Sequence, residues 1–272
     1  MVIRQNIVNL TSNEIAELWE GFRRIYSRID NLGFNYIAGF HGWPRQTCSH
    51  APESDTRGRQ VAKFLPWHRM YLYHFEYLLQ QALHNPDFGL PYWNWRSEQS
   101  IIEGIPAVIA EPVINNISNP LFKSHMRFEV RNPQGGLDII DRDTFRPDPN
   151  TRRSTLRDLV NNMQLRQIDL SNLYSNSDFN QFSEFLRTGY HNGIHGWVGG
   201  DMGVVEFAAY DPLFWFHHCN CDRVWSIWQS TNGIDTVPPH LRDVVLSPYE
   251  TTVRDVLNNA SLNYEYSSSS SR

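Results

Sequence analysis

Residues 64–79 have the sequence FLPWHRMYLYHFEYLL, in which apolar side chains recur with the period of an α-helix. Pro66 lies where the first turn of a helix tolerates proline, and the apolar period continues to Leu83. We therefore predict a helix over 67–83 that begins through Pro66. His68 lies near the start of this helix in an aromatic, apolar setting. An imidazole buried in such surroundings needs a polar partner or a metal ion.

Two further histidine-rich stretches follow in the second half, HNGIHGWVGGDMG at 191–203 and DPLFWFHHCNCDRVWSIWQ at 211–229. On a helix, His191 and His195 lie one turn apart on the same face, which suits one metal ion. The alternative is a pair of polar residues on a solvated face. Asp211 and Pro212 are typical of an N-cap and the first helical position, and we predict a helix from there to 228 or 229.

The remaining pattern predicts a mainly helical fold with long irregular loops and little β-structure. The capping box Thr11 to Glu14 starts a helix over 12–29, and others are expected at 35–42, 155–163 and 179–196. The polar stretch 45–63 and the Pro-, Gly- and Asn-rich stretch 86–150 are predicted to be loops. We expect one domain over 1–266 and a disordered serine-rich tail at 267–272.

Composition excludes several classes of protein. The 272 residues carry 24 Lys and Arg against 29 Asp and Glu, a formal charge of −5, with no basic block for nucleic acid. No apolar run approaches the roughly 20 residues of a membrane span, and no signal peptide is visible at the N-terminus, so we expect a cytoplasmic protein. The three cysteines, Cys48, Cys219 and Cys221, are too few for a disulfide scaffold, and we expect neither Cys219 nor Cys221 to bind metal.

The chain has 11 histidines, and three in each half are candidate metal ligands. The first half contributes His41, His50 and His68. Imidazole-rich sites with few carboxylates suit copper or zinc rather than magnesium or calcium. Two facing sites of three histidines favour a pair of coppers, and a zinc hydrolase is the alternative.

These strings, together with FHGWP (40–44), CSH (48–50) and LPYWNW (90–95), resemble the type 3 copper family of tyrosinases, catechol oxidases and molluscan haemocyanins. The resemblance spans nearly the whole chain and implies an antiparallel four-helix bundle around a dinuclear copper site. It implies that copper A is bound by His41, His50 and His68. It implies that copper B is bound by His191, His195 and His218, with His217 a core residue beside them.

The first half departs from the family pattern at one ligand. Most relatives have the second copper A histidine nine residues before the Trp-His pair, and Arg59 stands there in this chain. Arginine stays protonated and is no ligand. We infer a nine-residue insertion between His50 and the next helix. The resemblance also implies a thioether bond from Cys48 to His50, with a free thiol as the alternative.

A second departure concerns proton handling. Many relatives have a glutamate four residues before the first copper B histidine, where it orients a water, and Arg187 stands there in this chain. Glu184 is the candidate substitute, or else a solvated surface charge. By resemblance Asn192 helps to hold that water, and Gly196 leaves the entrance to copper B open. Arg187 itself suggests an acidic substrate such as a hydroxybenzoate.

The resemblance implies an oxidase that uses O2 to convert o-diphenols into o-quinones, with monophenols as substrates only where a base can ionise them. The alternatives are an o-aminophenol oxidase and a reversible O2 carrier of the haemocyanin type. Such carriers cover the site with an added domain, and we expect none after Gln229. We expect a small phenol as partner, no nucleic acid or membrane, and a copper chaperone as a candidate partner; the oligomeric state stays open.

Other residues are expected to be structural. Asp222 and Arg223 are predicted to form a buried pair or network between helices. His74, His84, His125 and His240 are expected to be ordinary surface or core residues. Tryptophan is expected mainly in the core and around the ligands, at Trp67, Trp93, Trp95, Trp197, Trp215, Trp225 and Trp228.

Overall fold

The computed structural model describes residues 1–147 and 170–267 and is mainly helical, as predicted. Its α-helices are α1 (Ser12–Tyr26), α2 (Phe34–Ala38), α3 (Phe64–Leu83), α4 (Glu98–Glu103), α5 (Ala107–Ala110), α7 (Leu170–Ser175), α8 (Phe179–Phe185), α9 (Asn192–Val198), α10 (Leu213–Asn232) and α11 (Pro239–Arg242). A π-helical turn, η4 (Leu186–His191), joins α8 to α9. The helix predicted at 155–163 and the tail from residue 268 lie outside the described residues.

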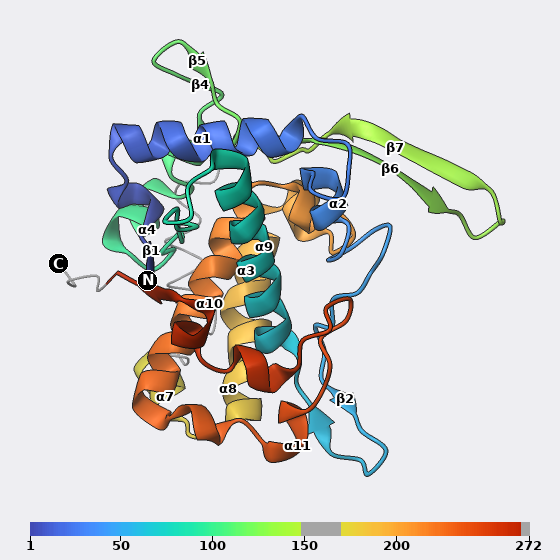
Figure 1. Ribbon diagram of the computed structural model, residues 1–272, viewed down its shortest axis with the longest axis vertical. Helices are drawn as coiled ribbons and strands as arrows, with labels where there is room; N and C mark the ends of the chain where they lie inside the picture. The colour runs from blue at the N-terminus through green and yellow to red at the C-terminus, as the bar shows by residue number, and fades with distance from the viewer. Residues whose placement is uncertain (148–169, 268–272) are drawn as a thin grey trace.

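Helices α3 and α10 form the centre of the bundle and run antiparallel (Figure 1). Near one end of the pair, the ring of Phe75 stacks on Trp215 with 3.6 Å between centroids. Further along, the ring of His68 stacks on His218 at 4.3 Å. Both helices begin close to their predicted starts, since Pro66 lies in the first turn of α3 and Asp211 accepts a hydrogen bond from Leu213 N–H.

The segment α8–η4–α9 is one continuous helical path that packs against α10, also antiparallel to it (Figure 1). Phe182 stacks on Trp228 at 4.6 Å near the start of this path, and His195 lies 5.3 Å from His218 near its end. The predicted helix over 179–196 therefore exists, with a π-helical turn in its middle that periodicity did not predict. Because these helices pack antiparallel to α10, histidines from distant parts of the sequence lie at the same level of the bundle.

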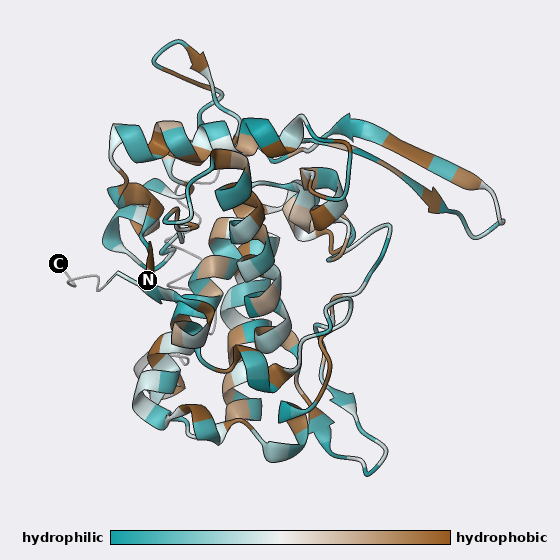
Figure 2. Ribbon diagram, viewed as in Figure 1, coloured by the Kyte–Doolittle hydropathy of each residue, from teal (hydrophilic) through white to brown (hydrophobic). Residues whose placement is uncertain are grey.

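Two helices are shorter than predicted. Helix α1 ends at Tyr26 rather than 29, because Ser27 N–H closes the last turn onto Arg23 O. Its bands of hydrophobic and hydrophilic residues alternate in Figure 2, as expected of a helix that lies across the bundle with one face exposed. Helix α2 ends at Ala38, and His41 lies in the following turn. Gly42 is required there, since a Cβ would lie 2.4 Å from Glu206 O.

The predictions of irregular loops at 45–63 and 86–150 were wrong in part. The first contains the hairpin β2 (Glu53–Ser54) and β3 (Gln60–Val61). The second contains α4, α5, the small hairpin β4 (Val113–Ile114) and β5 (Ile117–Ser118), and the hairpin β6 (His125–Arg131) and β7 (Leu137–Asp143). The β6–β7 hairpin projects from the body as an arm (Figure 1). Strand β6 has the strict alternation that predicts a strand, with Met126, Phe128 and Val130 between polar residues, so a signal was present and was missed.

The two ends of the described chain meet in a parallel pair of strands, β1 (Val2–Arg4) and β8 (Tyr264–Tyr266). The described 3-10 helices are η1 (Ile7–Asn9), η5 (Gly200–Gly203), η6 (Ala208–Tyr210), η7 (Ile234–Thr236), η8 (Val253–Val256) and η9 (Asn259–Leu262). Within the described ranges, no helix has both the length and the apolarity needed to cross a membrane.

A hydrophobic core fills the space between these elements. It includes all seven tryptophans that were predicted to be structural: Trp67, Trp93, Trp95, Trp197, Trp215, Trp225 and Trp228.

A buried ionic network ties α3, α10 and β1 together. Asp222 on α10 accepts from Arg69 Nε at 2.6 Å and from Arg4 Nη1 at 3.4 Å, and all three side chains are almost fully buried. Burial alone would raise the pKa of Asp222, but the two guanidinium groups and two tyrosine hydroxyls lower it. Asp222 thus belongs to a buried network between helices, as predicted, and Arg223 lies over the ring of Tyr92.

We expect Asp222→Asn to destabilise the fold by about 3–5 kcal/mol, since it leaves Arg69 buried without its counter-charge and Arg4 with Glu76 alone. Urea unfolding of the metal-free protein measures this. The matched control is Glu20→Gln, which breaks the exposed Glu20–Arg24 pair and should cost less than about 0.5 kcal/mol. Equal losses of unfolding free energy in the two variants would show that the buried network stabilises the fold no more than the exposed pair does.

Candidate metal centre

One cluster of candidate ligands comes from the first half of the chain. His41 follows α2, His50 precedes the β2–β3 hairpin, and His68 lies in the first turns of α3. The Nε2 atoms of His41 and His50 are 3.0 Å apart. Cys48 Sγ lies 3.6 Å from Nε2 of both His50 and His68. These four side chains offer ligand atoms within 4.8 Å of one another.

A second cluster comes from the second half. His191 ends the π-helical turn η4, His195 lies one turn later on α9, and His217 and His218 lie on α10. The Nε2 atoms of His195 and His218 are 3.1 Å apart. The four ligand atoms again lie within 4.8 Å of one another.

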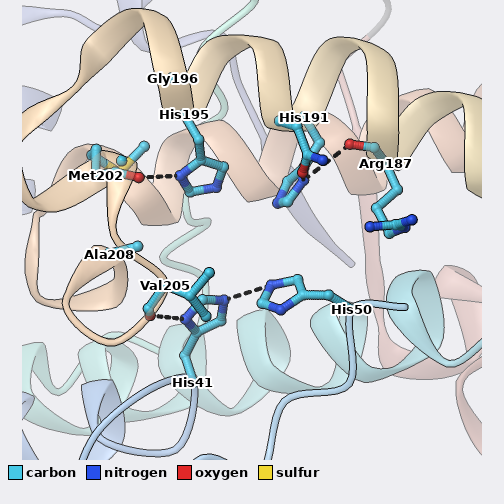
Figure 3. Close-up of a pocket in the computed structure, with 11 residues that line it drawn as sticks. His41, His50, Arg187, His191, His195, Gly196, Met202, Val205 and Ala208 are labelled. Carbon is cyan, nitrogen blue, oxygen red and sulfur yellow. Dashed lines mark hydrogen bonds between the residues drawn. The ribbon is translucent and has the colours of Figure 1, made fainter. Parts of the chain in front are cut away.

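The two clusters face each other across the bundle. The rings of His68 and His218 are stacked with 4.3 Å between centroids, and those of His50 and His191 are 5.8 Å apart. Figure 3 shows His191 and His195 approaching from one side and His41 and His50 from the other. All six histidines that the resemblance implied therefore lie together in one centre.

Backbone carbonyls orient most of these rings. Nδ1 of His41 lies 3.2 Å from Val205 O, and Nδ1 of His195 lies 2.6 Å from Met202 O. His68 has the same arrangement, with Nδ1 2.7 Å from Phe64 O. A carbonyl oxygen only accepts, so each Nδ1 carries the proton and each Nε2 presents a lone pair to the centre.

His191 is oriented by a side chain as well. Its Nδ1 lies 2.9 Å from Asn192 Oδ1 and 3.3 Å from Arg187 O. Its Nε2 is buried and has no hydrogen-bond partner among the described residues. Asn192 is thus placed to hold a ligand ring.

Burial keeps these imidazoles neutral. It lowers the pKa of His50 to about 4, helped by the charges of His195 and Arg187, and it lowers the pKa of His195 to about 4. The pKa values of His41, His68 and His191 are also well below the ordinary value, first through burial and then through neighbouring imidazoles. Neutral imidazole is the form that binds metal.

The donor set fits two copper ions. Lone pairs of neutral nitrogens converge at about 3 Å in both clusters, an arrangement that repels itself unless a cation lies between them. Within the described part of the chain, neither cluster includes a carboxylate. A set of imidazoles without carboxylates suits copper or zinc.

An open cavity of about 350 Å³ reaches this centre. Four of the six histidines line it, while His68 and His218 lie deeper. Gly196 also lines it, and a Cβ at this position would meet nothing within 4 Å. The remaining described lining residues are Arg187, Asn192, Met202, Gly203, Val205 and Ala208.

Glu184 and Arg187 form an ion pair at the edge of the site. The Arg187 guanidinium meets the carboxylate of Glu184 through Nη2 at 2.6 Å and through Nε at 3.0 Å. Glu184 is not among the described residues that line the cavity. Both of its oxygens bind Arg187, so it is not placed to accept a proton from a molecule beside the histidines.

The loop before α3 explains why Arg59 stands at the position where most relatives have a histidine ligand. Arg59 lies on the exposed β2–β3 hairpin and pairs with Asp55 at 2.7 Å, away from both clusters. This hairpin occupies the interval where we inferred an insertion. The thioether stays a prediction: Cys48 Sγ lies within 3.8 Å of both ring nitrogens of His50, and burial raises the pKa of the thiol.

Sequence reasoning missed several contributors to the site. The carbonyls of Met202 and Val205 carry no residue-type signal, although Met202 lies within a quoted motif. The π-helical turn at η4 depends on backbone register. His217 was expected beside the ligands as a core residue, and its ring stacks on His191 with 5.5 Å between centroids. The adjacent pair His217 and His218 was the sequence feature that pointed to it.

A family model described as the common central domain of tyrosinase matches residues 31–231. The chain belongs to the tyrosinase family of type 3 copper proteins. This membership confirms the resemblance and supports the interpretation of the two histidine clusters as a dinuclear copper site.

Relatives of this chain include proteins named hemocyanin and a protein named polyphenol oxidase. The chain is 31% identical over 270 residues to "Hemocyanin A-type, units Ode to Odg" of Enteroctopus dofleini, covering 91% of this chain and 20% of that protein. It is 32% identical over 185 residues to "Polyphenol oxidase latent form, chloroplastic" of Prunus armeniaca, covering 62% of this chain and 30% of that protein. The chain thus spans well under half the length of these relatives.

Solved structures share the fold. A tyrosinase from Burkholderia thailandensis superposes with a TM-score of 0.81 at 19% identity, covering 99% of this chain and 75% of that one. A functional unit from octopus hemocyanin gives a TM-score of 0.71 at 24% identity, covering 98% and 68%. Similarity at these identities establishes the tyrosinase-like fold alone.

The metal-free protein is expected to lose stability as the pH falls below about 6.5. The unfolded chain takes up protons there, whereas the folded clusters stay neutral to about pH 4. Lowered histidine pKa values thus give stability that is complete above about pH 6.5 and is lost on acidification. Urea midpoints between about pH 7.5 and about pH 5 measure this, and a flat profile would contradict the buried neutral state.

Proposed function

We propose that the chain is a copper oxidase that uses O2 to oxidise o-diphenols to o-quinones. The observation that carries this proposal is the open cavity, which reaches His41, His50, His191 and His195 from solvent. A small aromatic ring can enter such a space, and Gly196 leaves it unobstructed. An O2 carrier needs access for dioxygen only.

The stoichiometry of the reaction is fixed by electron balance. Two o-diphenols lose two electrons and two protons each and become two o-quinones, while one O2 becomes two waters. Copper ions bound in the two clusters would supply the redox chemistry. The chain itself would bind the ring and keeps the imidazoles neutral.

Orientation of the ligands is the main task of the protein. Carbonyls of Val205, Phe64 and Met202 hold three Nδ1 protons, and Asn192 holds a fourth. With their tautomers fixed, the rings present Nε2 without rearrangement. Met202, Val205 and Ala208 give the cavity an apolar wall against which a phenol ring can pack.

We propose that diphenols are preferred over monophenols. Hydroxylation of a monophenol requires a base for its phenolic proton. Arg187 is donor-only, and no carboxylate lines the cavity among the residues that the structure describes. An o-diphenol needs no hydroxylation, because its ring already carries both oxygens.

Reversible O2 binding is the second candidate function, and the named hemocyanin relatives favour it. The two functions differ in what happens to O2 once a phenol is present. A carrier binds O2 and releases it, whereas an oxidase consumes it. Oxidation of o-aminophenols by the same site is a variant of the first function.

Copper stoichiometry tests the ligand assignment. The purified protein should bind two copper ions per chain, and His195→Gln should lower this to about one, because it removes one of three ligands from copper B. The matched control is His240→Gln, which removes a histidine outside both clusters and should leave two ions. Elemental analysis after dialysis measures the ratio, and two tightly held ions in His195→Gln would refute the assignment.

Oxygen consumption distinguishes the functions. With catechol, the copper-loaded protein should consume one O2 for every two quinones, and the metal-free protein should consume none. An oxygen electrode with parallel absorbance of the quinone gives this ratio. Binding of O2 that reverses on removal of the gas, without quinone, would overturn the oxidase and favour the carrier. Consumption with o-aminophenol but not catechol would reassign the substrate.

A further inference from the structure

One charged side chain faces the proposed substrate cavity. Of the described residues that line it, Arg187 alone is an Arg, Lys, Asp or Glu, and the histidines would bind copper as neutral imidazoles. The opposite wall is apolar, with Met202, Val205 and Ala208 lying across the cavity from Arg187 in Figure 3. A molecule in this cavity therefore meets a cation at one end and hydrocarbon at the other.

The π-helical turn η4 places this cation beside the metal centre. Arg187 and His191 belong to the same turn, and Arg187 O lies 3.3 Å from His191 Nδ1. The Arg187 side chain points to the level of His50 (Figure 3), and only 16% of it is exposed. A charge at such a partly buried position acts more strongly than one on the open surface.

Glu184 occupies only one edge of the guanidinium. It binds Nε and Nη2, which leaves Nη1 and the second hydrogen of Nη2. Within residues 1–147 and 170–267, no acceptor binds Nη1. This free edge has the spacing that receives a carboxylate through two parallel hydrogen bonds.

We propose that Arg187 selects phenolic substrates that carry a carboxylate on the ring, with a dihydroxybenzoate as the simplest example. This inference rests on the proposed oxidase function. The carboxylate binds the free edge of Arg187, the ring packs on the apolar wall, and the two hydroxyls face the histidines. Glu184 fixes the guanidinium in place and partly offsets its charge, which limits the preference to about ten- to hundredfold.

The test compares two catechols that differ in charge. The copper-loaded protein is assayed with 3,4-dihydroxybenzoate and with 4-methylcatechol, which replaces the carboxylate by a methyl group, and the readout is the ratio of their kcat/KM values. Arg187→Gln should lower the acid-to-neutral ratio about ten- to hundredfold, mainly through KM. Glu184→Gln should raise the ratio, since it removes the competing carboxylate.

Arg59→Gln is the matched control. It removes an arginine from the neighbouring β2–β3 hairpin, outside the cavity, and should leave the ratio as in the unaltered protein. Equal reductions in Arg59→Gln and Arg187→Gln would show a long-range charge effect and overturn the proposed contact. An unchanged ratio in Arg187→Gln would overturn it as well.

A second readout does not depend on turnover. Zinc binds the same kind of imidazole site and transfers no electrons, so the zinc-loaded protein can be titrated with both catechols in a calorimeter. The acid should bind more tightly than 4-methylcatechol, and Arg187→Gln should abolish the difference. Failure of oxidation with a retained calorimetric preference would reject the oxidase alone, whereas oxidation of both catechols without any preference would reject the Arg187 contact alone.

Discussion

Buried imidazoles whose Nδ1 protons are held by carbonyl oxygens are the constraint on which the rest of the structure depends. Once Val205, Met202 and Phe64 fix these protons, the Nε2 lone pairs of three rings point inward at short range. Such an arrangement is unfavourable without a cation. The fold must therefore hold the rings against their own repulsion when the metal is absent.

The architecture meets this demand with opposed helices and a dense core. Helices α3 and α10 bring His68 and His218 into a stacked pair, while the aromatic stack of Phe75 on Trp215 fixes the register of the same helices. One turn beyond the histidines, Asp222 joins α10 to α3 through Arg69. Rigid packing and a buried ion pair thus position the ligands from both sides.

The sequence predicted the long helices and the histidines because both leave local signals. Apolar residues recur at helical spacing around His68, and His191 and His195 lie one turn apart. The partners of Asp222 could not be predicted from local patterns, since Arg4 and Arg69 lie 218 and 153 residues away along the chain. Carbonyl acceptors leave no signal of residue type, and the π-helical turn at 186–191 depends on backbone register. The β6–β7 arm was missed although Met126, Phe128 and Val130 alternate with polar residues along β6.

The central claim is that two copper ions lie between imidazoles of the two halves of the chain. X-ray absorption at the copper edge of the fully loaded protein tests it most directly. The account predicts about three nitrogen donors per copper, imidazole scattering, a copper–copper vector and no sulfur donor, because it assigns three imidazoles to each copper and Cys48 to neither. Sulfur scattering at the copper, or a single isolated copper, would contradict it.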